Sequence, residues 1–165
     1  MYKYQDFTIR NLQKSDYSIV IDIINSIRLE YGVIISKEYD QDMQNYIAVE
    51  KYYLETGGLF WVVEKDNKIL GTAAFYPYKG VEKGAEIKKI YLLPEVRGIG
   101  LGKFLLQQLE LEIAARGFQT IWIKTVSLFN EAMSLYENSG YVQFLDLETP
   151  KIGYIYAKKS LINIL

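Results

Sequence analysis

A glycine-rich segment at residues 97–103 (RGIGLGK) carries the clearest chemical pattern in this sequence. It joins a strand-like segment to a segment with helical periodicity. Glycines let a ligand approach the backbone closely, and the free N–H groups of a first helical turn attract anions. The segment therefore predicts a phosphate-binding loop, and a pyrophosphate is the ligand that suits it best.

Three kinds of phosphate loop could account for these glycines. A P-loop needs G-x-x-x-x-G-K-[ST], but Arg97 occupies the first glycine position and Phe104 follows the lysine. The dinucleotide fingerprint needs G-x-G-x-x-G, but Lys103 stands where the third glycine belongs. The third pattern, R-x-x-G-x-G, fits residues 97–102 at every position.

Residues 91–102 (YLLPEVRGIGLG) closely resemble the acetyl-CoA motif of the GNAT acetyltransferase superfamily. The resemblance implies that the loop amides bind the pyrophosphate of acetyl-CoA. It also implies that the pantetheine arm lies beside the preceding strand, as an added strand would. The cofactor-binding residues expected on this basis are Ile90, Tyr91, Leu92, Arg97, Gly98, Ile99, Gly100, Leu101, Gly102 and Lys103, together with Asn130 from a second motif.

The second motif lies at residues 130–141 (NEAMSLYENSGY) and resembles the other conserved segment of the same superfamily. The resemblance implies that Asn130 contacts the cofactor and that Tyr136 lies near the thioester sulfur as the catalytic acid. The residue types alone also fit plainer roles. Asn130 suits the N-cap of a helix, and Tyr136, one of 15 tyrosines, suits a packing position in the core.

Acetyl transfer to an amine also needs a proton acceptor, because an ammonium group with a pKa near ~10.4 must lose a proton before it attacks a thioester. The sequence contains no histidine and no cysteine, so a cysteinyl acyl-enzyme is excluded and direct transfer in a ternary complex is expected. Glu86 begins a predicted strand, where related enzymes often carry a base or a water-bound glutamate. We predict Glu86 as the base, directly or through water; a surface carboxylate paired with Lys88 or Lys89 is the alternative.

The elements that position these residues follow from hydrophobic periodicity and turn chemistry. Strands are expected at residues 7–10, 59–65, 69–78, 85–93, 120–126, 141–148 and 152–159, and helices after an N-cap at Ser15 and at residues 40–53, 97–117 and 130–140. The order β-α-α-β-β-β-α-β-α-β-β predicts one α/β (α+β) domain over residues 1–165, with a central mixed sheet and helices on both faces. This order also matches the GNAT fold.

The strand at residues 85–93 has an irregular pattern. Ile87, Ile90 and Leu92 are all expected to face the core, yet residues three apart in a regular strand point to opposite faces. A β-bulge near Lys88 and Lys89 would reconcile them, and bulges are common beside active sites. The alternative is that Ile87 packs under the outer helices.

Composition narrows the function classes. A net charge of −1 offers no basic surface for nucleic acid, and no segment has the length and apolarity of a signal peptide or a membrane span. We therefore expect a cytoplasmic acetyltransferase that uses acetyl-CoA as co-substrate and no metal, with no nucleic acid or membrane partner. Two alternatives remain: a non-catalytic acyl-CoA-binding sensor, and a donor with a longer acyl group.

The acceptor amine is not fixed by the sequence. Small polyamine-like amines, antibiotics, and peptide or protein N-termini all remain open. Residues 30–55, which lie over the acceptor side in this superfamily, include Glu38, Asp40 and Asp42, so they provide either a wall for a cationic amine or an acidic solvent face. The apolar residues 160–165 either complete the last strand or form a homodimer interface.

Overall fold

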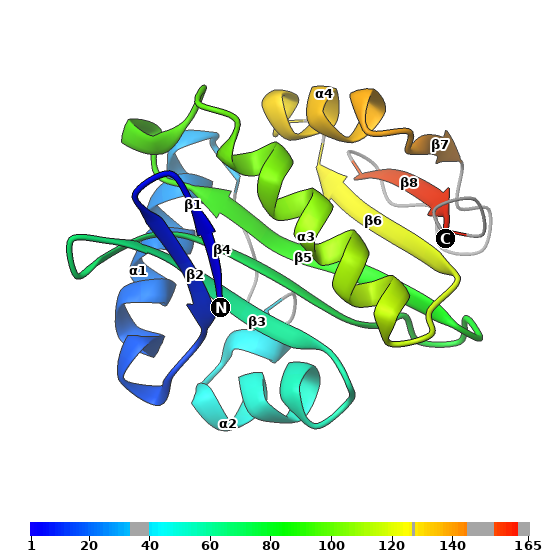
Figure 1. Ribbon diagram of the computed structural model, residues 1–165, viewed down its shortest axis with the longest axis horizontal. Coiled ribbons are helices and arrows are strands. Elements are labelled where there is room, and N and C mark those ends of the chain that lie inside the picture. Colours follow the sequence, from blue (N-terminus) through cyan, green and yellow to red (C-terminus); the bar gives the residue numbers. More distant parts are fainter. Residues whose placement is uncertain (34–39, 127, 145–153, 162–165) are drawn as a thin grey trace.

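The computed structural model describes residues 1–33, 40–126, 128–144 and 154–161 of the chain. Their strands form one sheet in the order β1-β2-β3-β4-β5-β6-β8-β7 (Figure 1). The strands are β1 (Tyr2–Tyr4), β2 (Phe7–Asn11), β3 (Leu59–Lys65), β4 (Lys68–Pro77), β5 (Gly84–Leu92), β6 (Thr120–Val126), β7 (Val142–Phe144) and β8 (Tyr154–Ser160). The helices are α1 (Tyr17–Glu30), α2 (Tyr46–Val49), α3 (Leu101–Ala115) and α4 (Asn130–Asn138), with helical turns η1 (Lys14–Asp16), η2 (Gln41–Met43), η3 (Glu50–Leu54) and η4 (Pro94–Val96).

The sheet is mixed, as expected. Strands β1 to β5 pair antiparallel, β5 and β6 pair parallel, and β6, β8 and β7 pair antiparallel. The predicted order of elements is confirmed with one addition, the strand β1. It has three residues, too few to show an alternating pattern, and it joins β2 through a turn at Gln5 with a φ of 49°.

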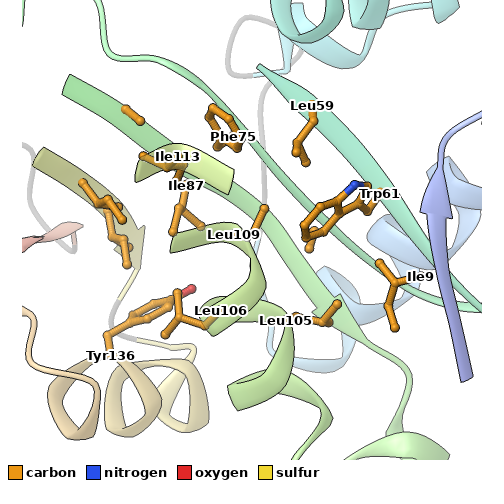
Figure 2. Close-up of a cluster of buried hydrophobic side chains, with 14 of the residues drawn as sticks. Ile9, Leu59, Trp61, Phe75, Ile87, Leu105, Leu106, Leu109, Ile113 and Tyr136 are labelled. Carbon is orange, nitrogen blue, oxygen red and sulfur yellow. The ribbon is translucent and has the colours of Figure 1, made fainter. Parts of the chain in front are cut away.

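Helices cover both faces of the sheet and bury two separate cores. Under α3, the side chains of Leu105 and Leu109 pack against Trp61 and Ile87 of the sheet (Figure 2). The second core lies beneath α1 and α2 and includes Phe60 of β3. Neighbouring residues of β3 therefore enter opposite cores, as the twofold repeat of a strand requires.

The predicted β-bulge in β5 is confirmed. Thr72 of β4 pairs with Tyr91, but Ala74 pairs with Lys88, so β5 contains one more residue than its partner over this stretch. Lys89 takes the left-handed conformation, with a φ of 58°, and the Thr72 hydroxyl donates to its carbonyl oxygen at 2.7 Å. The bulge lets Ile87, Ile90 and Leu92 share the core under α3.

Three helix boundaries differ from the prediction. Helix α3 begins at Leu101 and not at Arg97, because Gly98 and Gly100 adopt φ values of 75° and 84° that a right-handed helix cannot contain. Ser15 lies inside η1 and does not cap α1; the Asp16 carboxylate accepts the Gln13 N–H there, at 2.8 Å.

The third boundary is that of the helix expected at residues 40–53, which is divided into η2, α2 and η3. Asn45 accepts the Ala48 N–H at 2.8 Å, so it caps a new helix in the middle of the predicted one.

The end of the chain completes the sheet. Ser160 closes β8, and Leu161 is buried and donates its N–H to the Gln119 carbonyl at 2.8 Å. Residues 145–153, where predicted strands were expected to end and begin, lie outside the described residues, as do residues 162–165 of the expected dimer segment. Within the described ranges, no helix has both the length and the apolar character needed to span a membrane.

Candidate active site

Strands β5 and β6 separate at the bulge. They pair in parallel only from Gly84 to Ile87 on β5, opposite Thr120 to Ile123 on β6. Beyond this row each strand continues without pairing to the other, to Leu92 and to Val126. The divergence leaves a wedge-shaped opening in the middle of the sheet.

A pocket of about 290 Å³ lies beside this wedge. It contains eight of the predicted cofactor residues: Ile90, Tyr91, Leu92, Arg97, Gly98, Gly100, Gly102 and Lys103. Other lining residues come from α1 and its end (Ile27, Tyr31) and from around α4 (Phe129, Glu131, Ala132, Leu135). The pocket therefore joins the two faces of the sheet, because Leu92 packs against the core under α3 and Tyr91 against the core under α1.

The glycine loop presents a row of backbone donors to this pocket. Within the described part of the chain, the N–H groups from Gly98 to Lys103 donate to no protein acceptor, whereas the next one, of Phe104, donates to the Gly100 carbonyl at 3.0 Å. The Tyr4 hydroxyl of β1 donates to the Ile99 carbonyl at 2.5 Å, and this hydrogen bond ties the loop to the first strand. Such a set of unpaired amides at a helix N-terminus suits a pyrophosphate.

Arg97 is held by protein groups. Its Nε donates to the Leu92 carbonyl at 2.8 Å, and its two Nη atoms lie 2.6 and 2.9 Å from the Glu30 carboxylate. Its guanidinium carbon also lies 5.4 Å from the centre of the Tyr31 ring. The positive charge of Arg97, one of the expected cofactor-binding residues, is thus partly compensated by Glu30.

Three predicted cofactor residues do not line the pocket. Leu101 is buried in the core under α3, and the side chain of Ile99 is 40% exposed. Asn130 is exposed and is the first residue of α4; the N-cap position belongs to Phe129, so the capping role considered for Asn130 is wrong. Its neighbours Phe129, Glu131 and Ala132 line the pocket, but Asn130 does not.

Tyr136 points from α4 into the core between α3 and the sheet (Figure 2). Its side chain is 6% exposed, and its ring lies 6.0 Å from that of Tyr141. Burial, and after it the nearby Tyr91, raise the pKa of Tyr136 well above the ordinary value for a phenol. The hydroxyl is therefore protonated at neutral pH, as a proton donor must be.

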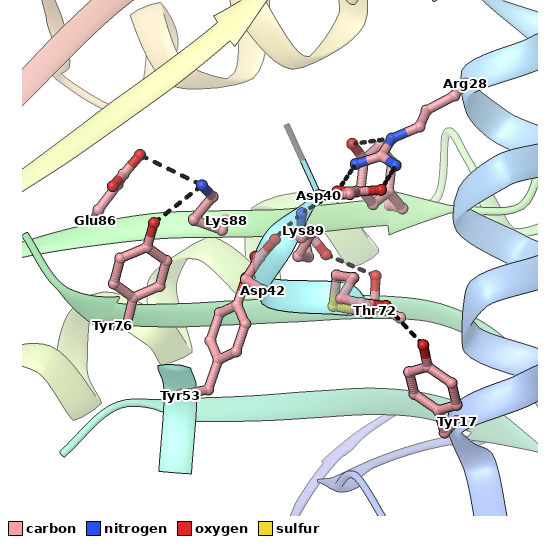
Figure 3. Close-up of polar contacts among 12 residues, drawn as sticks. Tyr17, Arg28, Asp40, Asp42, Tyr53, Thr72, Tyr76, Glu86, Lys88 and Lys89 are labelled. Carbon is pink, nitrogen blue, oxygen red and sulfur yellow. Dashed lines mark hydrogen bonds and ion pairs between the residues drawn. The ribbon is translucent and has the colours of Figure 1, made fainter. Parts of the chain in front are cut away.

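Glu86 lies on the opposite face of the sheet, at the row where β5 and β6 separate (Figure 3). It is only 5% exposed, and its carboxylate lies 3.9 Å from Lys88 Nζ, which also lies 3.1 Å from the Tyr76 hydroxyl. Burial, followed by the charge of Glu86, raises the pKa of Tyr76 to about 12. Tyr76 consequently keeps its proton at neutral pH and lies in one cluster with Glu86 and Lys88.

Comparison with known proteins identifies the family. Residues 20–141 match the sequence profile of the Acetyltransferase (GNAT) family. The N-acetyltransferase YjgM of Escherichia coli is 30% identical over 138 residues, which are 83% of each chain. The chain belongs to the GNAT acetyltransferase family. It is accordingly an acetyl-CoA-dependent N-acetyltransferase, as the glycine loop predicted.

Solved structures of other GNAT proteins have the same fold. An acetyltransferase of the GNAT family from Staphylococcus aureus superposes with a TM-score of 0.81 at 24% identity, over 94% of this chain and 99% of that one. An acetyltransferase from Salmonella typhimurium, solved with its cofactor acetyl-CoA, gives a TM-score of 0.76 at 21% identity over 96% of each chain.

The sequence did not reveal a buried charge network beside this GNAT site. Lys89 Nζ lies 3.3 Å from both Asp40 and Asp42, and Arg28 Nη2 lies 3.1 Å from Asp40 (Figure 3). Asp42 also accepts a hydrogen bond from Tyr53. Asp40 and Asp42 are therefore paired with buried cations, so they form neither the wall for a cationic amine nor the acidic solvent face that the sequence left open. Glu38, the third acidic residue of that expectation, lies outside the described residues.

Proposed function

We propose that this enzyme transfers the acetyl group of acetyl-CoA directly to a primary amine, of a small molecule or of a peptide or protein N-terminus, within a ternary complex. The observation that carries the proposal is the pocket at the wedge, which is lined by residues of both sheet faces. A thioester that enters along Leu92 can meet an amine that approaches on the face of Glu86. The two substrates can then react without a covalent enzyme intermediate, in a chain that has no cysteine.

The donor is expected to bind with its pyrophosphate on the amides of residues 98–103, and with its pantetheine arm along β5 beside Ile90 and Leu92. Arg97 and Lys103 add positive charge nearby. A backbone N–H of β5 near Leu92 is the group that we assign to the thioester oxygen, whose negative charge grows as the amine attacks.

In the chemical step the amine nitrogen forms a bond to the thioester carbon, and the bond from that carbon to sulfur breaks. Glu86 accepts the proton that the amine loses, directly or through water. Tyr136 donates a proton to the departing sulfur, so that coenzyme A leaves as a thiol. The burial of both side chains, which keeps bulk water from the two proton transfers, supports these assignments.

A panel of primary amines, assayed with acetyl-CoA by the thiol released, tests the proposal. At least one amine should be acetylated, and Glu86→Gln should lower kcat at neutral pH by roughly 10²-fold, with a smaller loss at high pH where the amine deprotonates unaided. Glu82→Gln, an exposed carboxylate in the preceding turn, is the control. If acetyl-CoA binds and no amine of the panel is acetylated, transfer to a primary amine is overturned.

A further inference from the structure

One row of the sheet leads from Glu86 toward its outer strands. Glu86 of β5 pairs in register with Trp122 of β6, and Trp122 pairs with Lys158 of β8. Residues in register on paired strands point to the same face. With strands ~4.8 Å apart, the backbone of Lys158 is about 10 Å from that of Glu86. An acceptor whose amine reaches Glu86 therefore extends over Trp122 toward Lys158.

Trp122 is the centre of an aromatic surface beside this row. Its ring stacks on Tyr78 at 5.2 Å and meets the edge of Phe144 at 5.2 Å; Phe144 lies 5.7 Å from Tyr156. We name these four residues the aromatic shelf. The indole N–H donates to the Thr120 hydroxyl at 2.9 Å, so Trp122 has its own polar group satisfied and offers an apolar face.

The helices of this face do not reach the shelf. Among the described residues, the core beneath α1 and α2 has no member from β6, β7 or β8. Trp122 and Phe144 are partly exposed, and Val142, which pairs with Lys158, is 67% exposed. Tyr156 is the buried member of the shelf, whereas the partly exposed rings of Trp122 and Phe144 beside the row of Glu86 are suited to bind a flat apolar group.

Lys158 gives the shelf a positive charge. Its Nζ lies 5.4 Å from the centre of the Trp122 ring and 5.6 Å from that of Phe144. The side chain is exposed, and it pairs with no carboxylate in the described part of the chain. Its ammonium is thus positioned above the aromatic rings, and none of the described carboxylates compensates its charge.

The charges nearest Glu86 on this face are matched. Glu86 has Lys88 beside it, and Asp40 and Asp42 share Lys89 and Arg28. A cationic acceptor such as a polyamine would find no spare carboxylate among these residues, whereas an anionic group would find Lys158.

We propose that the acceptor is a small amine that carries a flat apolar group and, beyond it, a carboxylate. The amine lies at Glu86, the apolar group lies on the aromatic shelf, and the carboxylate is bound by Lys158. This inference rests on the proposed acetyl transfer at the same site, and it makes Lys158 a specificity-determining residue.

Three acceptors of nearly equal shape test the inference. Para-aminomethylbenzoate, benzylamine and para-xylylenediamine share one ring and one aminomethyl group, and their far ends are anionic, neutral and cationic. The diamine has two equivalent amines, so its kcat/KM is halved before the comparison. The value of kcat/KM, measured by thiol release at saturating acetyl-CoA, should be about fivefold higher for the carboxylate than for benzylamine, the size of one exposed charge pair. The diamine should react more slowly than benzylamine.

Variants of Lys158 and Trp122 then test which residues cause the preference for the carboxylate. Lys158→Glu should reverse the order of the carboxylate and the diamine. The ratio of their kcat/KM values should fall by at least about 25-fold, because the attraction of the carboxylate and the repulsion of the diamine, each worth about fivefold, are both lost. Trp122→Ala should lower kcat/KM for all three amines, with circular dichroism to confirm the fold. Lys14→Glu, an equal charge change in the connection before α1, should leave the order intact.

The outcomes separate this inference from the proposed function. If benzylamine and the carboxylate react equally well, or if Lys158→Glu leaves the ratio unchanged, the inference is overturned and acetyl transfer stands. The same holds if only amines outside this series are acetylated. If no primary amine is acetylated at all, the proposed function fails and the inference fails with it.

Discussion

The guanidinium of Arg97 and the carboxylate of Glu30 form a two-pronged ion pair, at 2.6 and 2.9 Å, that joins the end of α1 to the start of the glycine loop. Both groups lie beside the pocket in which an anionic cofactor is expected. Glu30 therefore compensates part of the positive charge that would otherwise attract the phosphates.

The first prediction concerns this compensation. Glu30→Gln should lower the Kd for acetyl-CoA by up to about fivefold at low ionic strength, and Arg97→Ala should raise it by a similar factor. Calorimetry at low and high salt measures both effects, which salt should weaken. Glu55→Gln, an exposed carboxylate, is the control. Weaker binding by Glu30→Gln would instead mean that the ion pair serves to hold the shape of the loop.

The second prediction uses Gly102 to place the phosphates. A Cβ atom there would meet Leu135 and Leu92 at ordinary contact distances of 3.6 and 3.7 Å, so a side chain is tolerated. Gly102→Asp should raise the Kd for acetyl-CoA at least about 100-fold, because a negative charge would lie within a few ångströms of the pyrophosphate.

Gly102→Asn adds a side chain of the same shape as Gly102→Asp but without the charge. Its loss of affinity for acetyl-CoA should be smaller, and it measures the effect of side-chain bulk alone. Equal affinities of the two variants would show that no phosphate lies at this turn. Gly100 is a poorer test, since its φ is 84° and a Cβ would lie 2.6 Å from the Tyr4 hydroxyl. A substitution there would strain the loop as well as change its charge.

The third prediction concerns the buried ammonium of Lys89. Lys89→Met should destabilise the fold by about 3 kcal/mol, because Asp42 would keep a buried charge without its cation. Burial raises the pKa of Asp40, but Arg28 and Lys89 outweigh it and leave that pKa below its ordinary value. The stability that Asp40 adds is thus present above about pH 4 and is lost as the pH falls.

Urea unfolding at neutral pH and at pH values below 4 measures these effects. The double variant Lys89→Met/Asp42→Asn should recover part of the loss, and Lys14→Met on the surface should change little. An unchanged unfolding midpoint for Lys89→Met would show that the network adds nothing to stability.

Local patterns made much of this molecule predictable. The strands expected at residues 59–65 and 69–78 are present as β3 and β4, and the tight turn between them contains Asp66 and Asn67 with positive φ values of 51° and 60°. The parity of Ile87 and Ile90 predicted the bulge, because only an extra residue lets both reach one core. The glycine spacing predicted the loop, and the resemblance of residues 91–102 to the acetyl-CoA motif implied eight of the 14 residues that line the pocket.

The remaining features depend on contacts that are distant in sequence. Nothing in the order of residues shows that Arg28 and Lys89 meet at Asp40, or that Tyr31 lines the same pocket as Phe129. The segment expected as one helix at residues 40–53 is divided because Asp42 turns inward to pair with Lys89. Such a tertiary contact overrides helical propensity and cannot be predicted from it.

The last prediction concerns Tyr136 as the proton donor. Within the described residues its hydroxyl has no hydrogen-bond partner, so Tyr136→Phe should keep the fold and the KM for acetyl-CoA. If the hydroxyl protonates the departing sulfur, kcat should fall ~10- to 100-fold, as expected for an interaction made mainly in the transition state. Steady-state kinetics with any accepted amine gives both constants.

Tyr141→Phe is the matched control, because Tyr141 is also buried but donates to Glu110 at 3.0 Å, and its loss should reduce stability without lowering kcat. Alkaline unfolding supplies a second readout. Since burial, then Tyr91, raises the pKa of Tyr136, the folded state keeps this phenol neutral and loses stability as the pH rises above ~10, where an unfolded tyrosine ionises. Tyr136→Phe should therefore resist alkaline unfolding better than the wild type, whatever its role in catalysis. A variant that shows this resistance and still turns over at the wild-type rate would make Tyr136 a packing residue and leave solvent to protonate the thiolate.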